Sequence, residues 1–292
     1  MIKKIENENL IVEINEIGAG LYSIKSKKTG IEYLWQGNPT YWSGRAPILF
    51  PICGRLYGGK YVYKGKEYEM PIHGIVKTSE FDTSKKSDKE IKFILRSNDN
   101  TKKQYPFDFE FEVRYSLNGD SLEITYYVKN NDSKEMPFSL GSHPAFNVPF
   151  NSGETFEDYY IEFGKDVLDK IVLSDKCFYM GETQQYSLKD KKLDLQHNIF
   201  DNDALFFVMN TDKVKLKSKS KENYIEVSFN DMTCLGLWHT PKTDAPYVCI
   251  EPWHGIPSDE GKIDNLDTKR QTIKIQHDKT YQNTFVIKIS EN

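Results

Sequence analysis

Arginine and long apolar stretches are what this sequence has least of. Only five of its 39 basic residues are arginines, and the many lysines are interspersed with acidic residues, which gives a net charge of −4. A nucleic-acid-binding surface needs a sustained basic stripe, and the sequence has none. A membrane-spanning helix needs roughly 20 apolar residues, and no segment approaches that length. We therefore expect neither a nucleic-acid partner nor a membrane partner.

Cysteine is also scarce, and its placement argues against a disulfide framework. Cys53, Cys177, Cys234 and Cys249 are spread along the chain without a C-x-x-C pair. The N-terminal segment 1–6 lacks the apolar core of a secretory signal. We therefore expect reduced thiols in the core of a cytoplasmic protein.

Several catalytic signatures are missing. The sequence has no G-x-x-x-x-G-K-[ST] loop, no G-x-G-x-x-G after a strand, no G-x-S-x-G elbow and no H-E-x-x-H helix. These absences argue against phosphoryl transfer from a nucleotide and against serine-type acyl transfer. The six histidines are dispersed, so we expect no metal site built from neighbouring residues.

Apolar and polar residues alternate along many segments, as they do in strands with one buried face. The clearest examples are 10–14, 61–63, 109–113 and 122–126. Asn118-Gly119 and Lys64-Gly65 predict hairpin turns between such strands. Further strands are expected at 93–97, 136–140, 158–163, 205–209, 214–218, 223–229, 233–238, 247–251 and 283–289.

The spacing of turns favours an antiparallel β-sandwich. No window of 12 residues carries the apolar stripe of an amphipathic helix, so long helices are not expected. Short strands with turns every eight to twelve residues are typical of an all-β sandwich rather than of βαβ units. The sequence has no repeat and no linker, and we expect a single domain over residues 1–292.

Four segments set polar side chains among glycine, proline and aromatic residues. Such positions at strand ends and in loops commonly carry function. The segments are 46–55, which ends in Arg55, 70–74 with His73, 140–147 with His143, and 249–255 with Glu251. In the last segment, we expect the strand to end at Pro252.

Together and in this order, these segments resemble the aldose 1-epimerase (galactose mutarotase) family, best its shorter, lactose-operon-associated branch. The matching motifs are L-F-P-I-x-G-R at 49–55, P-x-H-G at 71–74, G-x-H-P-A-F-N at 141–147 and E-P-W-x-G at 251–255. The resemblance extends over nearly the whole chain. It implies a galactose mutarotase-like supersandwich, an open cleft lined by the motifs, and no cofactor.

The resemblance also implies roles for individual residues. His143 matches the general acid that protonates the ring oxygen of a sugar, and Glu251 matches the general base that deprotonates the anomeric hydroxyl. His73 and Arg55 match residues that position the ring oxygen and neighbouring hydroxyls. Asp203 matches an aspartate that holds sugar hydroxyls.

Other assignments are more open. Asp201 lies two residues before Asp203, on the same side of the extended strand that we expect there, and competes for the same role. Trp253, Phe146 and Trp238 are candidates for stacking on the sugar, since aromatic faces suit its apolar side. Where larger mutarotases carry an Asn-Arg pair, this chain has Gly54-Arg55-Leu56, so the resemblance leaves hydroxyl recognition open at this position.

The implied activity is mutarotation of a hexose, and three alternatives stay open. A hexose-6-phosphate 1-epimerase would need extra cations, for which Arg45, Arg55 and Lys77 are available. A non-catalytic carbohydrate-binding protein would not need both His143 and Glu251. A glycoside hydrolase would need two carboxylates about 5–9.5 Å apart. An exposed edge strand would allow a homodimer.

Overall fold

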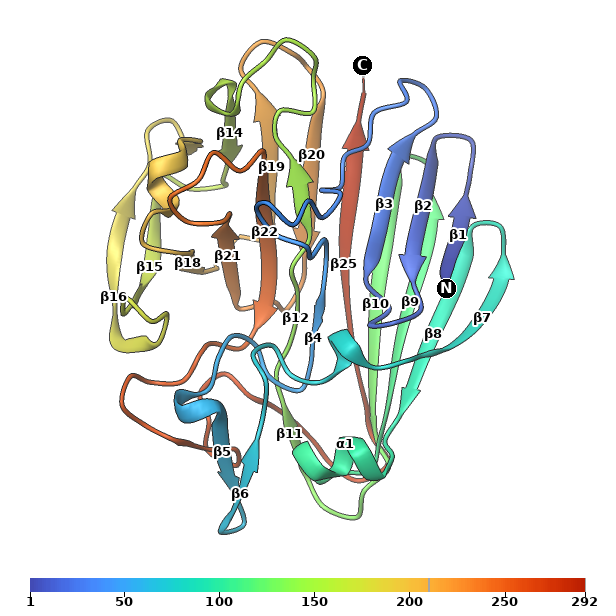
Figure 1. Ribbon diagram of the computed structural model, residues 1–292, viewed down its shortest axis with the longest axis vertical. Helices are drawn as coiled ribbons and strands as arrows, with labels where there is room; N and C mark the ends of the chain where they lie inside the picture. The colour runs from blue at the N-terminus through green and yellow to red at the C-terminus, as the bar shows by residue number, and fades with distance from the viewer. Residues whose placement is uncertain (210, 292) are drawn as a thin grey trace.

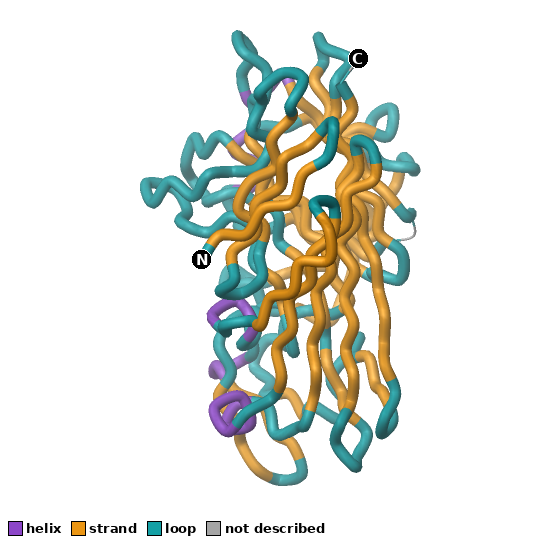
Figure 2. The backbone as a smooth tube through the Cα atoms, turned by 90° about the vertical axis from the view of Figure 1, so that its right-hand side faces the viewer, coloured by secondary structure: helices purple, strands orange, loops and turns teal. Residues whose placement is uncertain are grey.

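The computed structural model describes residues 1–209 and 211–291, and strands dominate it (Figure 1). The α-helix α1 (Asp99–Gln104) is short, and the side chain of Asn98 caps its N-terminus by accepting from two backbone amides. Figure 2 shows the helical turns beside the strands. They are η1 (Tyr57–Gly59), η2 (Val76–Thr78), η3 (Phe156–Asp158) and η4 (His197–Phe200). No helix in this part of the chain is long and apolar enough to cross a membrane.

One layer of the molecule is a nine-stranded antiparallel sheet. Its central strands alternate strictly between buried and partly exposed residues, which is the pattern that the sequence predicts. In spatial order the strands are β17 (Lys192–Asp194), β14 (Tyr159–Glu162), β19 (Lys213–Ser218), β20 (Tyr224–Phe229), β25 (Thr280–Ser290), β10 (Ser121–Asn130), β9 (Phe109–Asn118), β8 (Glu90–Arg96) and β7 (Asp82–Ser87).

The second layer consists of two sheets. An eight-stranded sheet contains β16 (Tyr179–Ser187), β15 (Val167–Leu173), β18 (Leu205–Val208), β21 (Cys234–Trp238), β22 (Tyr247–His254), β12 (Leu140–Ser142) and β4 (Ile48–Leu49) in this order, with β13 (Ala145–Asn147) also paired to β22. A three-stranded sheet contains β1 (Ile2–Glu6), β2 (Leu10–Asn15) and β3 (Leu21–Ser26). This smaller sheet lies over β8–β10 (Figure 1).

Two small sheets complete the strand inventory of the described residues. One joins β23 (Asp264–Asn265), β5 (Lys60–Tyr63) and β6 (Lys66–Glu69), and the other pairs β11 (Met136–Phe138) with β24 (Ile273–Ile275). The pairing of β23 with β5 is parallel, whereas the ladders of the large sheets are antiparallel. The expected all-β antiparallel sandwich is therefore confirmed.

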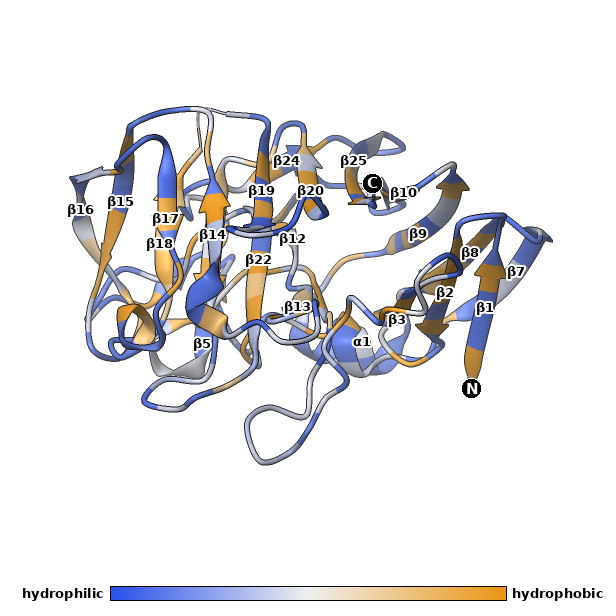
Figure 3. Ribbon diagram, turned by 90° about the horizontal axis from the view of Figure 1, so that it is seen from above, coloured by the Kyte–Doolittle hydropathy of each residue, from blue (hydrophilic) through white to orange (hydrophobic). Residues whose placement is uncertain are grey.

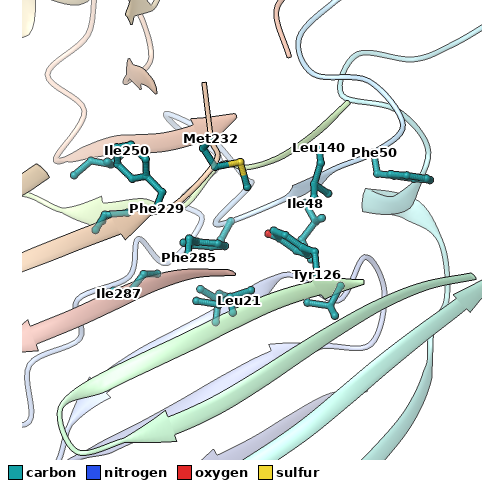
Figure 4. Packing of buried hydrophobic residues seen from close by; sticks show 14 of the residues in the cluster. Leu21, Ile48, Phe50, Tyr126, Leu140, Phe229, Met232, Ile250, Phe285 and Ile287 are labelled. Carbon is teal, nitrogen blue, oxygen red and sulfur yellow. The ribbon is translucent and has the colours of Figure 1, made fainter. Parts of the chain in front are cut away.

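The main hydrophobic core lies between the two layers. Figure 4 shows Ile250 and Leu140 of the second layer opposite Phe285, Ile287 and Tyr126 of the nine-stranded sheet. Seen from above, β22 is apolar along much of its length, while the surrounding loops are mostly polar (Figure 3). All four cysteines are buried free thiols, as expected.

Both predicted hairpin turns are present. Gly119 (φ 58°) lies in the turn between β9 and β10. Lys64 (φ 50°) and Gly65 (φ 78°) form the turn between β5 and β6. Two consecutive residues with positive φ give the turn twist that matches paired strands.

The prediction that Pro252 ends its strand is wrong, because β22 continues to His254 and pairs Pro252 with Leu235 of β21. The reason lies on the other side of β22. The amide of Ile250 donates to the carbonyl of Pro144 on that side, and position 252 faces the same way. On that side, the paired residues stop at Gly141 and Trp253 and resume at Ala145 and Cys249, so no ladder pair includes Pro252. The missing proline N–H therefore costs no ladder hydrogen bond.

Candidate active site

A cavity of about 690 Å³ opens beside β22, within the size range of small-molecule sites. Leaving aside Asp201, which competes with Asp203 for one role, seven of the eight predicted site residues line it, although they come from six separate segments of the chain. They are Arg55, His73, His143, Asp203, Trp238, Glu251 and Trp253. The fold therefore brings the polar residues of all four sequence motifs to one cavity.

The register of β22 places His143 opposite Glu251. Ala145 of β13 pairs with Cys249 of β22, so two residues further along this antiparallel pair His143 faces Glu251. The amide of His143 donates to the carbonyl of Pro47, which holds the backbone of this segment. The resulting distance between His143 Nε2 and Glu251 Oε2 is 3.3 Å.

Burial controls the protonation of this pair. His143 is 7% exposed and Glu251 is 3% exposed. Desolvation lowers the pKa of His143 to about 3 and, with a smaller contribution from the charge of Asp203, raises the pKa of Glu251 well above its usual value. Burial disfavours the charged form of each group. Burial therefore favours the form in which the pair carries one titratable proton, on the Glu251 carboxyl, and neither group is charged.

Aromatic rings enclose the imidazole of His143. The ring of Trp42 is tilted by 31° to it, with ring centroids 5.0 Å apart, and Trp238 meets it edge-on at 5.7 Å. Both tryptophans line the cavity. Trp238 is among the residues that the sequence suggests for stacking. Trp42 was missed, because it lies in none of the four motifs and in no strand.

Backbone bonds fix His73 and its tautomer. The amide of Gly54 donates to His73 Nδ1 at 3.2 Å, and the amide of His73 donates to the carbonyl of Gly54 at 2.8 Å. Since Nδ1 accepts, the ring proton lies on Nε2. Burial, with smaller contributions from the neighbouring side chains of His143, Lys77 and Arg55, lowers the pKa of His73 well below its usual value. His73 is therefore a neutral hydrogen-bond donor at neutral pH.

Asp203 lies between a cation and a thiol. Its Oδ2 atom is 4.0 Å from Arg55 Nη2 and accepts from Cys177 Sγ at 2.8 Å. Burial and the carboxylate together raise the pKa of Cys177 to about 12, so the thiol keeps its proton and donates. The role of Cys177 was missed, since an isolated cysteine in the sequence carries no such signal.

The structure distinguishes Asp203 from Asp201. Asp203 lines the cavity, whereas Asp201 is exposed and is not part of the cavity wall. We expected these two residues to lie on an extended strand, but they lie in the turn between η4 and β18. Asp203 has a φ of 73° there, which turns its side chain independently of Asp201.

Phe146 is the predicted site residue that the structure places elsewhere. Its side chain is fully buried in the main core cluster and does not line the cavity. Successive residues of a strand point to opposite faces, and Phe146 on β13 points into the sandwich. The expectation that it contacts the sugar is corrected: Phe146 is a packing residue. Trp253 does line the cavity, packed against the rings of Phe206 and His73.

Lys77 adds a cation to the cavity wall. It follows Ile75 and Val76 into η2, and its side chain is partly buried. That burial lowers the pKa of Lys77. Among the residues that the structure describes, no carboxylate lies within ion-pair distance of its ammonium group.

Comparisons of the chain with known proteins point to one family. The family model described as aldose 1-epimerase matches residues 2–260. Protein LacX, encoded on a plasmid of Lactococcus lactis subsp. lactis, is 35% identical over 94% of this chain and 95% of its own length.

Solved structures give the same result. A galactose mutarotase related enzyme from Lactobacillus acidophilus has a TM-score of 0.93 and 34% identity, covering 100% of this chain and 98% of that one. A galactose mutarotase-like protein from Lactobacillus casei also has a TM-score of 0.93, with 30% identity over 99% of this chain and 100% of that one. The architecture is therefore that of a galactose mutarotase-like β-sandwich.

Proposed function

The chain belongs to the aldose 1-epimerase family, and we propose that it interconverts the α and β anomers of a hexose by acid–base opening and closure of the ring. The observation that carries this proposal is the contact between His143 Nε2 and Glu251 Oε2 at 3.3 Å in the wall of the cavity. Both groups are buried, and each can hold or release a proton.

Ring opening needs one group to remove a proton and another to supply one. Glu251 takes the proton from the anomeric hydroxyl O1, and His143 delivers a proton to the ring oxygen O5 while the C1–O5 bond breaks. Rotation about C1–C2 turns the aldehyde, and closure on its other face gives the other anomer with the two roles reversed. Such proton transfers contribute about 10²–10⁴-fold each.

The single proton of the pair suits this chemistry. Neutral Glu251 with neutral His143 contains as many protons as the ion pair in which Glu251 is a carboxylate and His143 an imidazolium. Sugar hydroxyls that donate to the Glu251 carboxylate and accept from the His143 imidazolium favour these charged forms. Binding of the sugar thus converts the resting pair into a base at Glu251 and an acid at His143, without a proton from solvent.

The other wall residues hold the sugar. His73, with its proton on Nε2, donates to a ring or hydroxyl oxygen. Arg55 and Asp203 offer complementary donors and acceptors, and Cys177 keeps the Asp203 carboxylate oriented. Trp238 and Trp253 present aromatic faces for the apolar side of the ring.

Exchange between anomers, followed by NMR with a panel of aldoses, tests this proposal. We expect the protein to accelerate exchange of at least one free hexose above the rate in buffer. Calorimetry on the same sugars tests the alternative function. Binding of a sugar without any acceleration of anomer exchange would support a non-catalytic carbohydrate-binding protein.

Lys77 favours a second candidate, a hexose 6-phosphate as the substrate. A phosphate needs a cation, and Lys77 lines the cavity without an acidic partner among the described residues. The test measures anomer exchange of a hexose and of its 6-phosphate, each with the wild type and with Lys77→Met. A phosphorylated substrate predicts faster exchange of the phosphate ester and loss of that preference in the variant. An equal effect of Lys77→Met on both sugars would contradict it.

A further inference from the structure

Three side chains with metal-binding atoms meet beside the cavity, whose wall includes two of them, His143 and Glu251. A ring nitrogen of His143, the sulfur of Cys249 and a carboxylate oxygen of Glu251 all lie within 4.8 Å of one another. All three residues are buried. The catalytic proposal uses His143 and Glu251 but gives no role to Cys249.

The fold, rather than chance, holds these atoms together. Cys249 and Glu251 are two residues apart on β22, so their side chains lie on the same face of that strand. Ala145 pairs with Cys249, which brings His143 across from Glu251. The trio is therefore built on adjacent segments of one sheet, and sites on such rigid elements keep their geometry.

His143 has unused binding capacity within this trio. Its side chain is more than nine-tenths buried, yet Nδ1 has no hydrogen-bond partner among the residues that the structure describes. Buried polar atoms usually have a partner, and an orphaned one requires an explanation. Nε2 makes only the 3.3 Å contact with Glu251. No hydrogen bond to Nδ1 therefore fixes the orientation of the ring, and either ring nitrogen is available to a ligand.

We propose that His143, Cys249 and Glu251 bind one thiophilic divalent cation such as Zn²⁺ or Cd²⁺, and that this ion inhibits the enzyme. Nitrogen, thiolate and carboxylate donors form the set that zinc prefers. Three protein ligands leave a fourth position open. His143 and Glu251 line the cavity, so that position faces the space from which the ion enters.

Binding releases two protons to solvent. One leaves the thiol of Cys249, which coordinates as a thiolate, and the other is the proton shared by His143 and Glu251. Burial raises the pKa of Cys249, so the metal competes with a firmly held proton. Since metal ligands must be deprotonated, the apparent affinity rises with pH, by about tenfold per pH unit for each proton released.

The inhibition follows from the ligand set and rests on the proposed function. A bound ion occupies the lone pairs of both the acid and the base, so neither O1 nor O5 of a sugar can exchange a proton. The binding itself does not depend on what the enzyme catalyses. The two claims can therefore be tested separately.

Cd²⁺ binding is measured by the ultraviolet absorption of the sulfur-to-cadmium charge transfer, and Zn²⁺ binding by calorimetry. Cys249→Ala removes the sulfur, and Cys234→Ala removes another buried cysteine, on β21, as the matched control. We expect one Cd²⁺ per chain with a thiolate band in the wild type and in Cys234→Ala. Cys249→Ala should lose the band and bind Zn²⁺ at least about tenfold more weakly, the scale of losing one metal-site interaction. No binding to the wild type, or an unchanged band in Cys249→Ala, would overturn the site.

Anomer exchange in the presence of Zn²⁺ tests the inhibition. Without metal, Cys249→Ala should keep the wild-type rate. With metal, exchange by the wild type and by Cys234→Ala should stop, while exchange by Cys249→Ala continues. A metal that binds as described but leaves exchange unchanged would overturn the inhibitory role alone. A wild type that binds metal but catalyses no exchange would instead contradict the proposed function and leave the site standing.

Discussion

Gly54 and His73 hold each other through two hydrogen bonds. The amide of Gly54 donates to the ring of His73, and the amide of His73 donates to the carbonyl of Gly54. These two hydrogen bonds join the sequence motifs at 49–55 and 71–74. The bond from Gly54 also decides that Nε2 is the ring nitrogen of His73 that carries the proton.

Gly54→Ala should damage both stability and catalysis. Gly54 has a φ of 73°, and a Cβ atom there would lie 2.8 Å from the ring of Pro257. Strain of this kind costs about 1–3 kcal/mol, and the forced shift releases the ring of His73. We expect a lower Tm and a lower kcat/KM.

Gly65→Ala is the matched control for this substitution. Gly65 has a similar φ of 78°, but nothing lies within 4 Å of its added Cβ. It should lower the Tm through backbone strain alone and leave kcat/KM unchanged. Equal losses of kcat/KM in the two variants would refute the positioning role of Gly54.

The thiol of Cys177 should act through Asp203. Cys177→Ala removes the donor at 2.8 Å and leaves the carboxylate free to turn, which we expect to raise KM about fivefold, for a hydrogen bond of roughly 1 kcal/mol. Cys177→Ser restores a donor and should return KM towards the wild-type value. If both variants raise KM equally, the sulfur acts by packing rather than by hydrogen bonding.

Glu251→Gln should make stability less dependent on pH. The unfolded chain loses the Glu251 proton near the usual pKa, whereas the folded protein keeps it to higher pH. The unfolded state therefore binds fewer protons in this range, and the wild type loses stability as pH rises, by up to about 1.4 kcal/mol per pH unit.

Glutamine stays neutral at every pH, like the protonated acid, so the variant does not lose stability in this way as the pH rises. Urea unfolding of both proteins at a series of pH values above about 7.5, at least one pH unit above the usual pKa of histidine, measures the difference. The stability of Glu251→Gln relative to the wild type should increase with pH until the folded-state pKa of Glu251 is passed. A constant difference would mean that Glu251 is already a carboxylate in the folded protein.

Much of the fold could be predicted because its local signals agree with its tertiary contacts. Strands β9 and β10 alternate strictly, and Gly119 marks the turn between them. Strand β16 lacks that signal because nearly all of its residues are exposed, so no apolar face marks it. Pro252 was misread because its effect depends on a gap in the neighbouring chain, which sequence alone does not reveal.

The site could be predicted where residue type and motif coincide. His143 and Glu251 stand in motifs that resemble one family, and β22 brings them together. Phe146 stands in the same motif as His143, but the alternation along β13 turns it into the core. Trp42 and Cys177 reach the cavity through loops, whose course no periodic pattern encodes.

The most direct test of the central claim is the rate of anomer exchange, measured by NMR on the best sugar, for Glu251→Gln and His143→Gln. Calorimetry and unfolding curves establish that each variant is folded and binds the sugar. Removal of the base or of the acid should lower kcat by about 10²–10⁴-fold. Wild-type rates in both variants would contradict the assignment of His143 and Glu251 as the acid–base pair.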